Sequence, residues 1–115
     1  MNSPDLLKYF LPEGILDYFE LIEVKDSTEK LTIVLEEKPL VPEEQLGRKL
    51  HSKGFYPVVD IQDFPIRKKA CFLEVKRRRW IDIDTGEVFS RDWTLVAKGT
   101  RMTSEFAFFL KRLVR

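Results

Sequence analysis

The sequence has few of the residues that build metal centres and covalent cross-links. Its single cysteine, Cys71, excludes an internal disulfide and any zinc site made from several cysteines. Its single histidine, His51, excludes two-histidine metal motifs and leaves no spare base for a serine or cysteine triad. Since the sequence offers no nucleophile–base pair and no metal-ligand cluster, we expect no cofactor, no metal and no catalytic residue, and therefore a protein that is not an enzyme.

Long hydrophobic runs are also missing. No apolar segment approaches the roughly 20 residues of a membrane-spanning helix, and the N-terminus has no basic stretch followed by an apolar one. We therefore expect a cytoplasmic protein without a membrane partner. The 115 residues, 43% of them hydrophobic, are typical of one domain spanning 1–115, which is long enough to fold around a core without a metal or a disulfide.

Charge is distributed unevenly along the chain, although the net charge is only +1. Residues 1–47 contain four lysines, no arginine and eleven acidic residues, which gives a net charge of −7. Residues 48–115 contain sixteen basic and eight acidic residues, which gives a net charge of +8. The asymmetry predicts an acidic half beside a basic half whose surface binds a polyanion. The alternative is a domain whose two halves neutralise each other.

The acidic half begins with helix signals and continues with strand signals. A serine, a proline and an aspartate at 3–5 predict a capped short helix, and a second short helix is expected over 13–19. We interpret their apolar residues as packing on a sheet, with a partner-binding face as the alternative. Residues 21–25 and 31–36 predict a β-hairpin. Two acidic pairs beyond it are interpreted as solvated surface: Glu36-Glu37 and Glu43-Glu44.

The basic half contains the longest strand candidate, over 70–81. Within it Cys71, Leu73 and Val75 alternate onto one face, so we interpret the cysteine as a small buried hydrophobe rather than a reactive thiol. Before this strand the sequence predicts one helical turn over 48–53, in which His51 is an ordinary exposed side chain rather than a phosphate ligand. An extended segment over 55–61 and a turn at Asp63-Phe64-Pro65 are expected to follow.

Four adjacent cations and a tryptophan, at 76–80, are the densest feature of the sequence. In a strand, Arg77 and Arg79 point to one side, and Lys76 and Arg78 point to the other. Adjacent cations repel one another, but beside phosphate each of them releases condensed counterions, so the cluster predicts a nucleic-acid contact. The alternative is a solvated basic edge. Trp80 is interpreted as a core anchor, with stacking on a base as its alternative.

Two further elements complete the basic half. Residues 84–87 form a turn signal before the extended segment 88–90, which predicts a second β-hairpin with Gly86 at its tip. Thr103 is expected to cap a C-terminal helix with the apolar stripe Phe106, Phe109, Leu110 and Leu113. The expected fold class is therefore α+β, with short N-terminal helices, two antiparallel β-hairpins forming one small sheet, and a C-terminal helix packed on that sheet.

Four motifs of the basic half occur in a recognisable order. They are Asp63-Phe64-Pro65, Arg77-Arg78-Arg79-Trp80, Asp84-Thr85-Gly86-Glu87-Val88-Phe89 and Lys98-Gly99-Thr100-Arg101-Met102-Thr103. In this arrangement the sequence resembles the N-terminal region of bacterial insertion-sequence transposases, most closely the ISAon type. The resemblance implies a region related to a zinc ribbon, which acts beside a DDE-type catalytic transposase subunit encoded as a separate chain.

The resemblance has one chemical departure, because the cysteines of the ribbon are absent. Asp82 and Asp84 stand roughly where a second cysteine pair would be, and two carboxylates without soft ligands make a poor zinc site. The basic half, 48–115, is therefore expected to be a degenerate ribbon that binds no metal.

From charge, motifs and resemblance together we expect a non-catalytic DNA-binding component of a bacterial insertion-sequence transposase, which assists recognition of the element ends. Its expected partners are DNA and the separate catalytic subunit. The alternative is a protein-interaction module that docks the catalytic subunit or another partner without touching DNA. The cations expected to bind DNA are Arg67, Lys68, Lys69, Lys76, Arg77, Arg78, Arg79, Arg91, Lys98 and Arg101.

Overall fold

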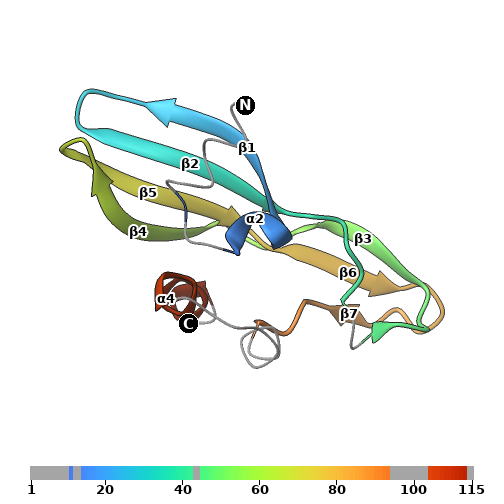
Figure 1. Cartoon of the computed structure of the whole chain (residues 1–115). Helices are drawn as coiled ribbons and strands as arrows, with labels where there is room; N and C mark the ends of the chain where they lie inside the picture. Colours follow the sequence, from blue (N-terminus) through green and yellow to red (C-terminus); the bar gives the residue numbers. More distant parts are fainter. Residues whose placement is uncertain (1–10, 12–13, 43–44, 94–103, 114–115) are drawn as a thin grey trace, which may run out of the picture.

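The computed structural model describes residues 11, 14–42, 45–93 and 104–113. Most of these residues lie in strands, and one helix follows the strands at the C-terminal end (Figure 1). The predicted α+β class is therefore confirmed, whereas the helix expected to begin at 3–5 falls on residues 1–10, which lie outside the described part of the chain. The elements in chain order are α2 (Ile15–Tyr18), β1 (Phe19–Asp26), β2 (Lys30–Glu37), β3 (Leu50–Phe55), β4 (Val59–Ile66), β5 (Lys69–Lys76), β6 (Arg78–Asp82), β7 (Val88–Phe89) and α4 (Ser104–Leu113).

The described strands form two sheets, which corrects the prediction of one small sheet made from two hairpins. The larger sheet has the order β1-β2-β5-β4 and joins two antiparallel hairpins through the parallel pair of β2 and β5. The smaller sheet has the order β3-β6-β7 and is antiparallel. Both predicted hairpins are present as β1–β2 and β6–β7, but they belong to different sheets.

One stretch of chain, 69–82, crosses from the larger sheet to the smaller, so the single strand predicted over 70–81 is in fact two strands. The reason is a change of neighbour. β2 ends at Glu37, shortly before Pro39, and β3 pairs with the crossing stretch from Arg78 onward. Arg77 lies at this change, and its carbonyl accepts a hydrogen bond from the N–H of Tyr56 at 2.8 Å.

Two local predictions before this stretch are wrong. The segment 48–53, predicted as a helical turn, supplies most of β3, because its backbone pairs with β6. Asp63 and Pro65, predicted to form a turn, lie within β4, which is an edge strand and tolerates a proline that cannot donate to the ladder. The chain turns instead at Arg67 and Lys68, whose φ values are +51° and +67°.

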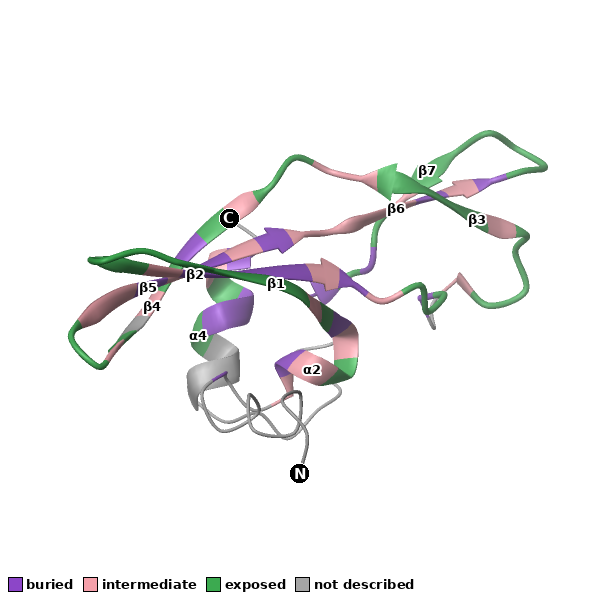
Figure 2. Ribbon diagram, turned by 90° about the horizontal axis from the view of Figure 1, so that it is seen from above, coloured by how far each residue is buried: buried purple, intermediate pink, exposed green. Residues whose placement is uncertain are grey.

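The core lies between one face of the larger sheet and the two described helices (Figure 2). Phe19 is central to it, because its ring stacks on Trp93 at 5.2 Å and meets Phe109 edge-on at 5.8 Å. The predicted burial of Cys71 is confirmed, as is that of the described part of the C-terminal stripe. The buried core residues are Leu11, Ile15, Phe19, Ile33, Leu35, Ile61, Cys71, Leu73, Val75, Trp93, Phe109, Leu110 and Leu113.

Candidate nucleic-acid interface

The two sides of β6 give the arginines of the basic cluster different surroundings. Arg77 and Arg79 share one side, as predicted, and both lie over the ring of Tyr56. Their guanidinium carbons are 5.2 and 5.7 Å from the ring centroid. Among the side chains that the structure describes, no carboxylate forms an ion pair with either guanidinium. These two positive charges therefore remain available to an anion from outside the chain.

Arg78 points to the opposite side and connects the two sheets. Its backbone N–H donates to Oε1 of Glu37, and its Nε donates to the Glu37 carbonyl, both at 3.0 Å. Its Nη1 donates to Oγ of Ser52 at 2.6 Å, and its guanidinium lies 4.6 Å from the centroid of the Phe55 ring. Because these contacts hold the guanidinium within the fold, Arg78 is a weaker candidate for DNA binding than its two neighbours.

Arg91 is buried, with only 7% of its surface exposed. Its Nε lies 3.4 Å from Oε2 of Glu37, and its Nη2 donates to the Leu40 carbonyl at 2.6 Å. The guanidinium also lies over the rings of Tyr18 and Trp93, at 5.3 and 5.9 Å. A guanidinium enclosed in this way does not reach a phosphate, so we remove Arg91 from the predicted interface.

Glu37 joins these two arginines. The prediction that it belongs to the solvated surface is wrong, since the residue is only 1% exposed. Burial raises the pKa of its carboxyl above the ordinary value, while the N–H of Arg78 and the charge of Arg91 act in the opposite direction. The neighbouring Glu36 is partly exposed on the other face of the sheet and pairs with Lys76 at 3.5 Å. Glu43 and Glu44 lie outside the described residues.

The remaining predicted cations fall into three groups. Lys69 pairs with Asp26, and Lys76 pairs with Glu36. Such surface ion pairs contribute little to the free energy of unfolding and are screened by salt, so these lysines can exchange their carboxylate for a phosphate. Arg67 and Lys68 are exposed at the turn between β4 and β5, and no described carboxylate pairs with them. The last group, Lys98 and Arg101, lies outside the described residues.

The structure therefore does not gather the predicted cations into one patch. Arg67 and Lys68 precede β5, whereas Arg77 and Arg79 follow it (Figure 1). The length of β5 separates the two groups by roughly 23 Å at the usual rise of a strand. A ligand that contacts both groups must be extended, as a nucleic-acid strand or duplex is.

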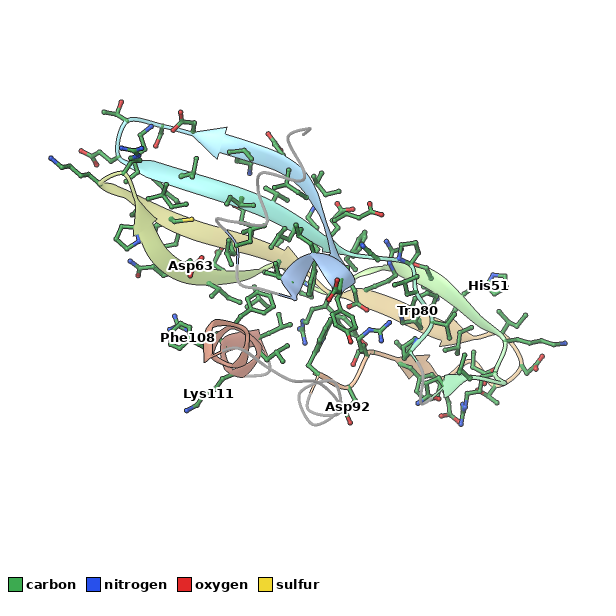
Figure 3. All side chains as sticks on the ribbon, viewed as in Figure 1. His51, Asp63, Trp80, Asp92, Phe108 and Lys111 are labelled. Atoms are coloured by element: carbon green, nitrogen blue, oxygen red, sulfur yellow. The ribbon has the colours of Figure 1, made fainter. Side chains whose placement is uncertain are left out.

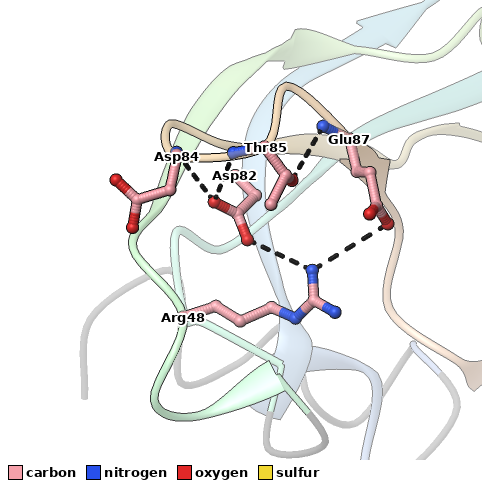
Figure 4. Close-up of polar contacts among 5 residues, drawn as sticks. All are labelled: Arg48, Asp82, Asp84, Thr85 and Glu87. Carbon is pink, nitrogen blue, oxygen red and sulfur yellow. Dashed lines mark hydrogen bonds and ion pairs between the residues drawn. The ribbon is translucent and has the colours of Figure 1, made fainter.

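Asp82 organises the turn between β6 and β7 (Figure 4). Its Oδ1 accepts the N–H groups of Asp84 at 2.9 Å and Thr85 at 3.2 Å, and its Oδ2 lies 3.1 Å from Nη1 of Arg48. The N–H of Asp84 contributes most to a lowered pKa of the Asp82 carboxyl, with Thr85 and Arg48 acting in the same direction. The same Nη1 lies 3.9 Å from Oε2 of Glu87. A carboxylate and a guanidinium thus hold the turn at which the resemblance implies a metal ligand.

The connection between β2 and β3 covers one face of the smaller sheet. Pro42 in this connection is fully buried, and the Arg48 guanidinium lies 4.5 Å from the centroid of the Phe89 ring. Trp80 is the cross-strand partner of Phe89, shares its face and is 3% exposed. The interpretation of Trp80 as a core residue is therefore confirmed.

No described element packs on the opposite face of the smaller sheet. Ile81 lies on it between its cross-strand partners His51 and Val88, on the same side of β6 as Arg79. His51 is exposed, as predicted, and projects from β3 away from the sheet (Figure 3). We refer to Tyr56, Arg77, Arg79, Ile81, His51 and Val88 as the open face.

Tyr56 is the member of this interface that the sequence did not reveal. It follows β3 directly and precedes Arg77 by about twenty positions, so only the pairing of β3 with β6 brings its ring to the arginines. An aromatic residue shortly before a basic strand is too common to predict a nucleic-acid contact. The burial of Glu37 is equally invisible in the sequence, because its arginine partners are far away along the chain.

Two features of the described part of the chain bear on metal binding and on thiol chemistry. No group of three or more His, Cys, Asp or Glu side chains there could hold a metal ion. Cys71 is 1% exposed, and its burial raises the pKa of the thiol, which opposes formation of the nucleophilic thiolate. In addition, none of the described helices is both long and apolar enough to cross a bilayer.

Comparison with known proteins adds no relative. No family model matches the chain, and neither a curated protein nor a solved structure is significantly similar to it.

Proposed function

We propose that this chain is a non-catalytic DNA-binding component of a bacterial insertion-sequence transposase, which acts in the cytoplasm and assists a separate DDE-type subunit in recognising the element ends. The motifs of the basic half, which resemble that family, support the assignment to transposition. The net charge of +8 over 48–115 supports a polyanionic ligand.

One observation in particular favours DNA. Arg77 and Arg79 lie side by side against Tyr56, and no described carboxylate neutralises them. Other cations of the chain do have such partners, for example Arg48 with Asp82. Two like charges held beside each other without a counter-ion are unfavourable in the free protein, and phosphates relieve that repulsion.

The proposed contacts are ranked by the freedom of each cation. Arg77, Arg79, Arg67 and Lys68 come first, because no described carboxylate pairs with any of them. Lys69 and Lys76 come second, because each must leave a surface ion pair. Lys98 and Arg101 stay in the proposal on their sequence alone.

The experiment is a salt titration of binding to a duplex that carries a single-stranded extension, a probe that offers both forms of DNA. Four phosphate contacts predict a slope of log affinity on log salt of about −3 to −4. The double variant R77A/R79A should weaken binding to all sequences alike and reduce the steepness of that slope by about two.

The matched control is the double variant K25A/K30A. It also removes two positive charges, but from the larger sheet, on the face opposite the core. There Lys25 pairs with Glu74, and Lys30 lies over the ring of Phe72. The control should leave the slope nearly unchanged. If the wild-type protein does not bind the probe at low salt, or if the two double variants behave alike, the proposal is wrong.

A second candidate function, docking of a protein partner, is favoured by the edge strand β1. Ile22 and Val24 on this strand are 47% and 43% exposed, and an edge strand has backbone groups free to pair with another chain. In this view the catalytic subunit adds a strand beside β1. Mixing with the purified catalytic subunit tests it: I22K/V24K should abolish a complex that R77A/R79A leaves intact.

A further inference from the structure

The open face of the smaller sheet contains more than phosphate binding requires. Beside the two guanidiniums it presents Ile81, which is half-buried, and Val88, which is 43% exposed. Phosphate oxygens gain nothing from contact with aliphatic side chains. The flat faces of nucleic-acid bases are apolar, so they are stabilised by contact with such side chains.

The guanidiniums themselves are arranged as flat surfaces. Arg77 and Arg79 both lie against the ring of Tyr56, and the Nε atom of each is enclosed, with no hydrogen-bond partner in the described part of the chain. The tyrosine thus limits the orientations that the two side chains adopt before any ligand binds. Proteins that bind unpaired strands stack bases on aromatic rings and on arginine planes of this kind.

The smaller sheet is broader than the elements that the major groove of a duplex admits most readily. The major groove admits a helix or a two-stranded ribbon. Here three strands lie side by side, and the connection containing Pro42 and Arg48 adds a second layer behind them. A duplex presents only the edges of its bases in its grooves, whereas an unpaired strand can lay both its phosphates and the flat faces of its bases on the open face.

We propose that the open face binds single-stranded DNA, with bases stacked on the guanidiniums of Arg77 and Arg79 and on the neighbouring Ile81 and Val88. This inference rests on the proposed DNA-binding function and specifies the form of DNA that this face takes. It assigns the contacts of Arg67 and Lys68, at the far end of β5, to phosphates alone.

The test compares three probes of equal length on the wild-type protein at one salt concentration: an oligothymidylate strand, a blunt duplex, and an abasic strand that has the phosphates but no bases. The oligothymidylate should bind at least about tenfold more tightly than the duplex and the abasic strand, the effect of losing one or two stacked bases.

The three probes separate this inference from the proposed function. If the duplex or the abasic strand binds as tightly as the oligothymidylate, the stacking inference is overturned, and DNA binding through phosphates stands. If none of the three probes binds, both the inference and the proposed function are overturned.

A charge-conserving variant tests the role of the flat guanidinium groups of Arg77 and Arg79. R77K/R79K keeps both positive charges but removes the flat guanidiniums, so oligothymidylate binding should fall about tenfold, while duplex binding changes less than about twofold. K25A/K30A is the control for changing cations elsewhere on the surface, and it should retain the preference for oligothymidylate over the duplex. Equal affinities of R77K/R79K and wild type for oligothymidylate, with the thermal transition unchanged, would exclude stacking.

Discussion

Glu37 and Arg78 connect the two sheets through a pair of hydrogen bonds, each 3.0 Å long. The backbone N–H of Arg78 donates to the Glu37 carboxylate, and the Arg78 side chain donates to the Glu37 carbonyl. Glu37 is the last residue of β2, and Arg78 is the first residue of β6. The carboxylate also faces the buried guanidinium of Arg91, so one side chain joins β2 both to β6 and to the segment that contains Arg91.

The first prediction concerns this connection. Glu37→Ala should destabilise the protein by about 3–5 kcal/mol, because it leaves the buried charge of Arg91 without its counter-ion and the N–H of Arg78 without an acceptor. Glu36→Ala is the matched control, since this neighbour forms a partly exposed pair with Lys76, and its loss should cost about 1 kcal/mol or less. Urea unfolding measures both, and equal losses would contradict the role assigned to Glu37.

The second prediction concerns pH and Asp82. Its pKa lies below the ordinary value of 3.8 in the folded protein, so the ionised carboxylate stabilises the fold above that value, and the stabilisation is lost as the pH falls further. Asp82→Asn should therefore lower the thermal midpoint at pH 7 and at pH 5, and the gap to wild type should narrow as the pH is taken below about 3.8.

Glu37 must be left intact in this comparison, because its pKa is raised whereas that of Asp82 is lowered. Its pKa is raised above 4.5, so its contribution to stability is greatest at low pH and decreases as the pH rises through the folded-state value. Thermal scans at several pH values on wild type and Asp82→Asn isolate the aspartate. A gap that stays constant across the acid range would show that Asp82 does not act through its charge.

The third prediction concerns the turn between β4 and β5. Arg67 and Lys68 both have positive φ, a conformation that Asn and Gly adopt at lower cost. The double variant R67N/K68G should therefore stabilise the protein by about 1 kcal/mol while weakening DNA binding, because two phosphate contacts are lost. The exchange R67K/K68R keeps both the charges and the strain and should change neither property. Stabilisation without any loss of DNA affinity would remove this turn from the interface.

The fourth prediction concerns the packing of α4. Phe109 is 1% exposed and meets Phe19 edge-on, so Phe109→Ala should cost about 3–5 kcal/mol. The adjacent Phe108 is 48% exposed and lies beside Arg112 on the outer surface of the helix, where Lys111 also points away from the sheet (Figure 3). Phe108→Ala should cost less than about 1 kcal/mol. A small shift of the urea midpoint for Phe109→Ala, at unchanged slope, would mean that the helix is not packed as described.

Features with local causes were predictable from the sequence. The alternation of Cys71, Leu73 and Val75 placed these residues on the core face, and the structure buries all three. The spacing of Phe109, Leu110 and Leu113 placed them on one side of a helix, and all three are buried. Both cases depend on the period of a single element, which neighbouring residues along the chain already specify.

Features that depend on pairing between distant segments were not predictable in this way. The segment 48–53 has weak strand propensity, and it becomes β3 because β6 offers it a partner. Likewise, nothing near Glu37 in the sequence distinguishes it from Glu36, yet one faces the arginines inside the fold and the other faces a surface lysine. A shift of one position along a strand reverses the face, so adjacent acidic residues have opposite environments.

The sequence by itself determined the division of charge between the halves, the α+β class and the presence of a basic strand, because composition and short-range periodicity specify these properties. The tertiary structure decided which cations are free. It buried Arg91 against Glu37, bound Arg78 to the same residue, and left Arg77 and Arg79 on Tyr56 without a described counter-ion. The reason is physical: an arginine's charge is local, but whether a carboxylate neutralises it depends on strand register, which long-range pairing sets.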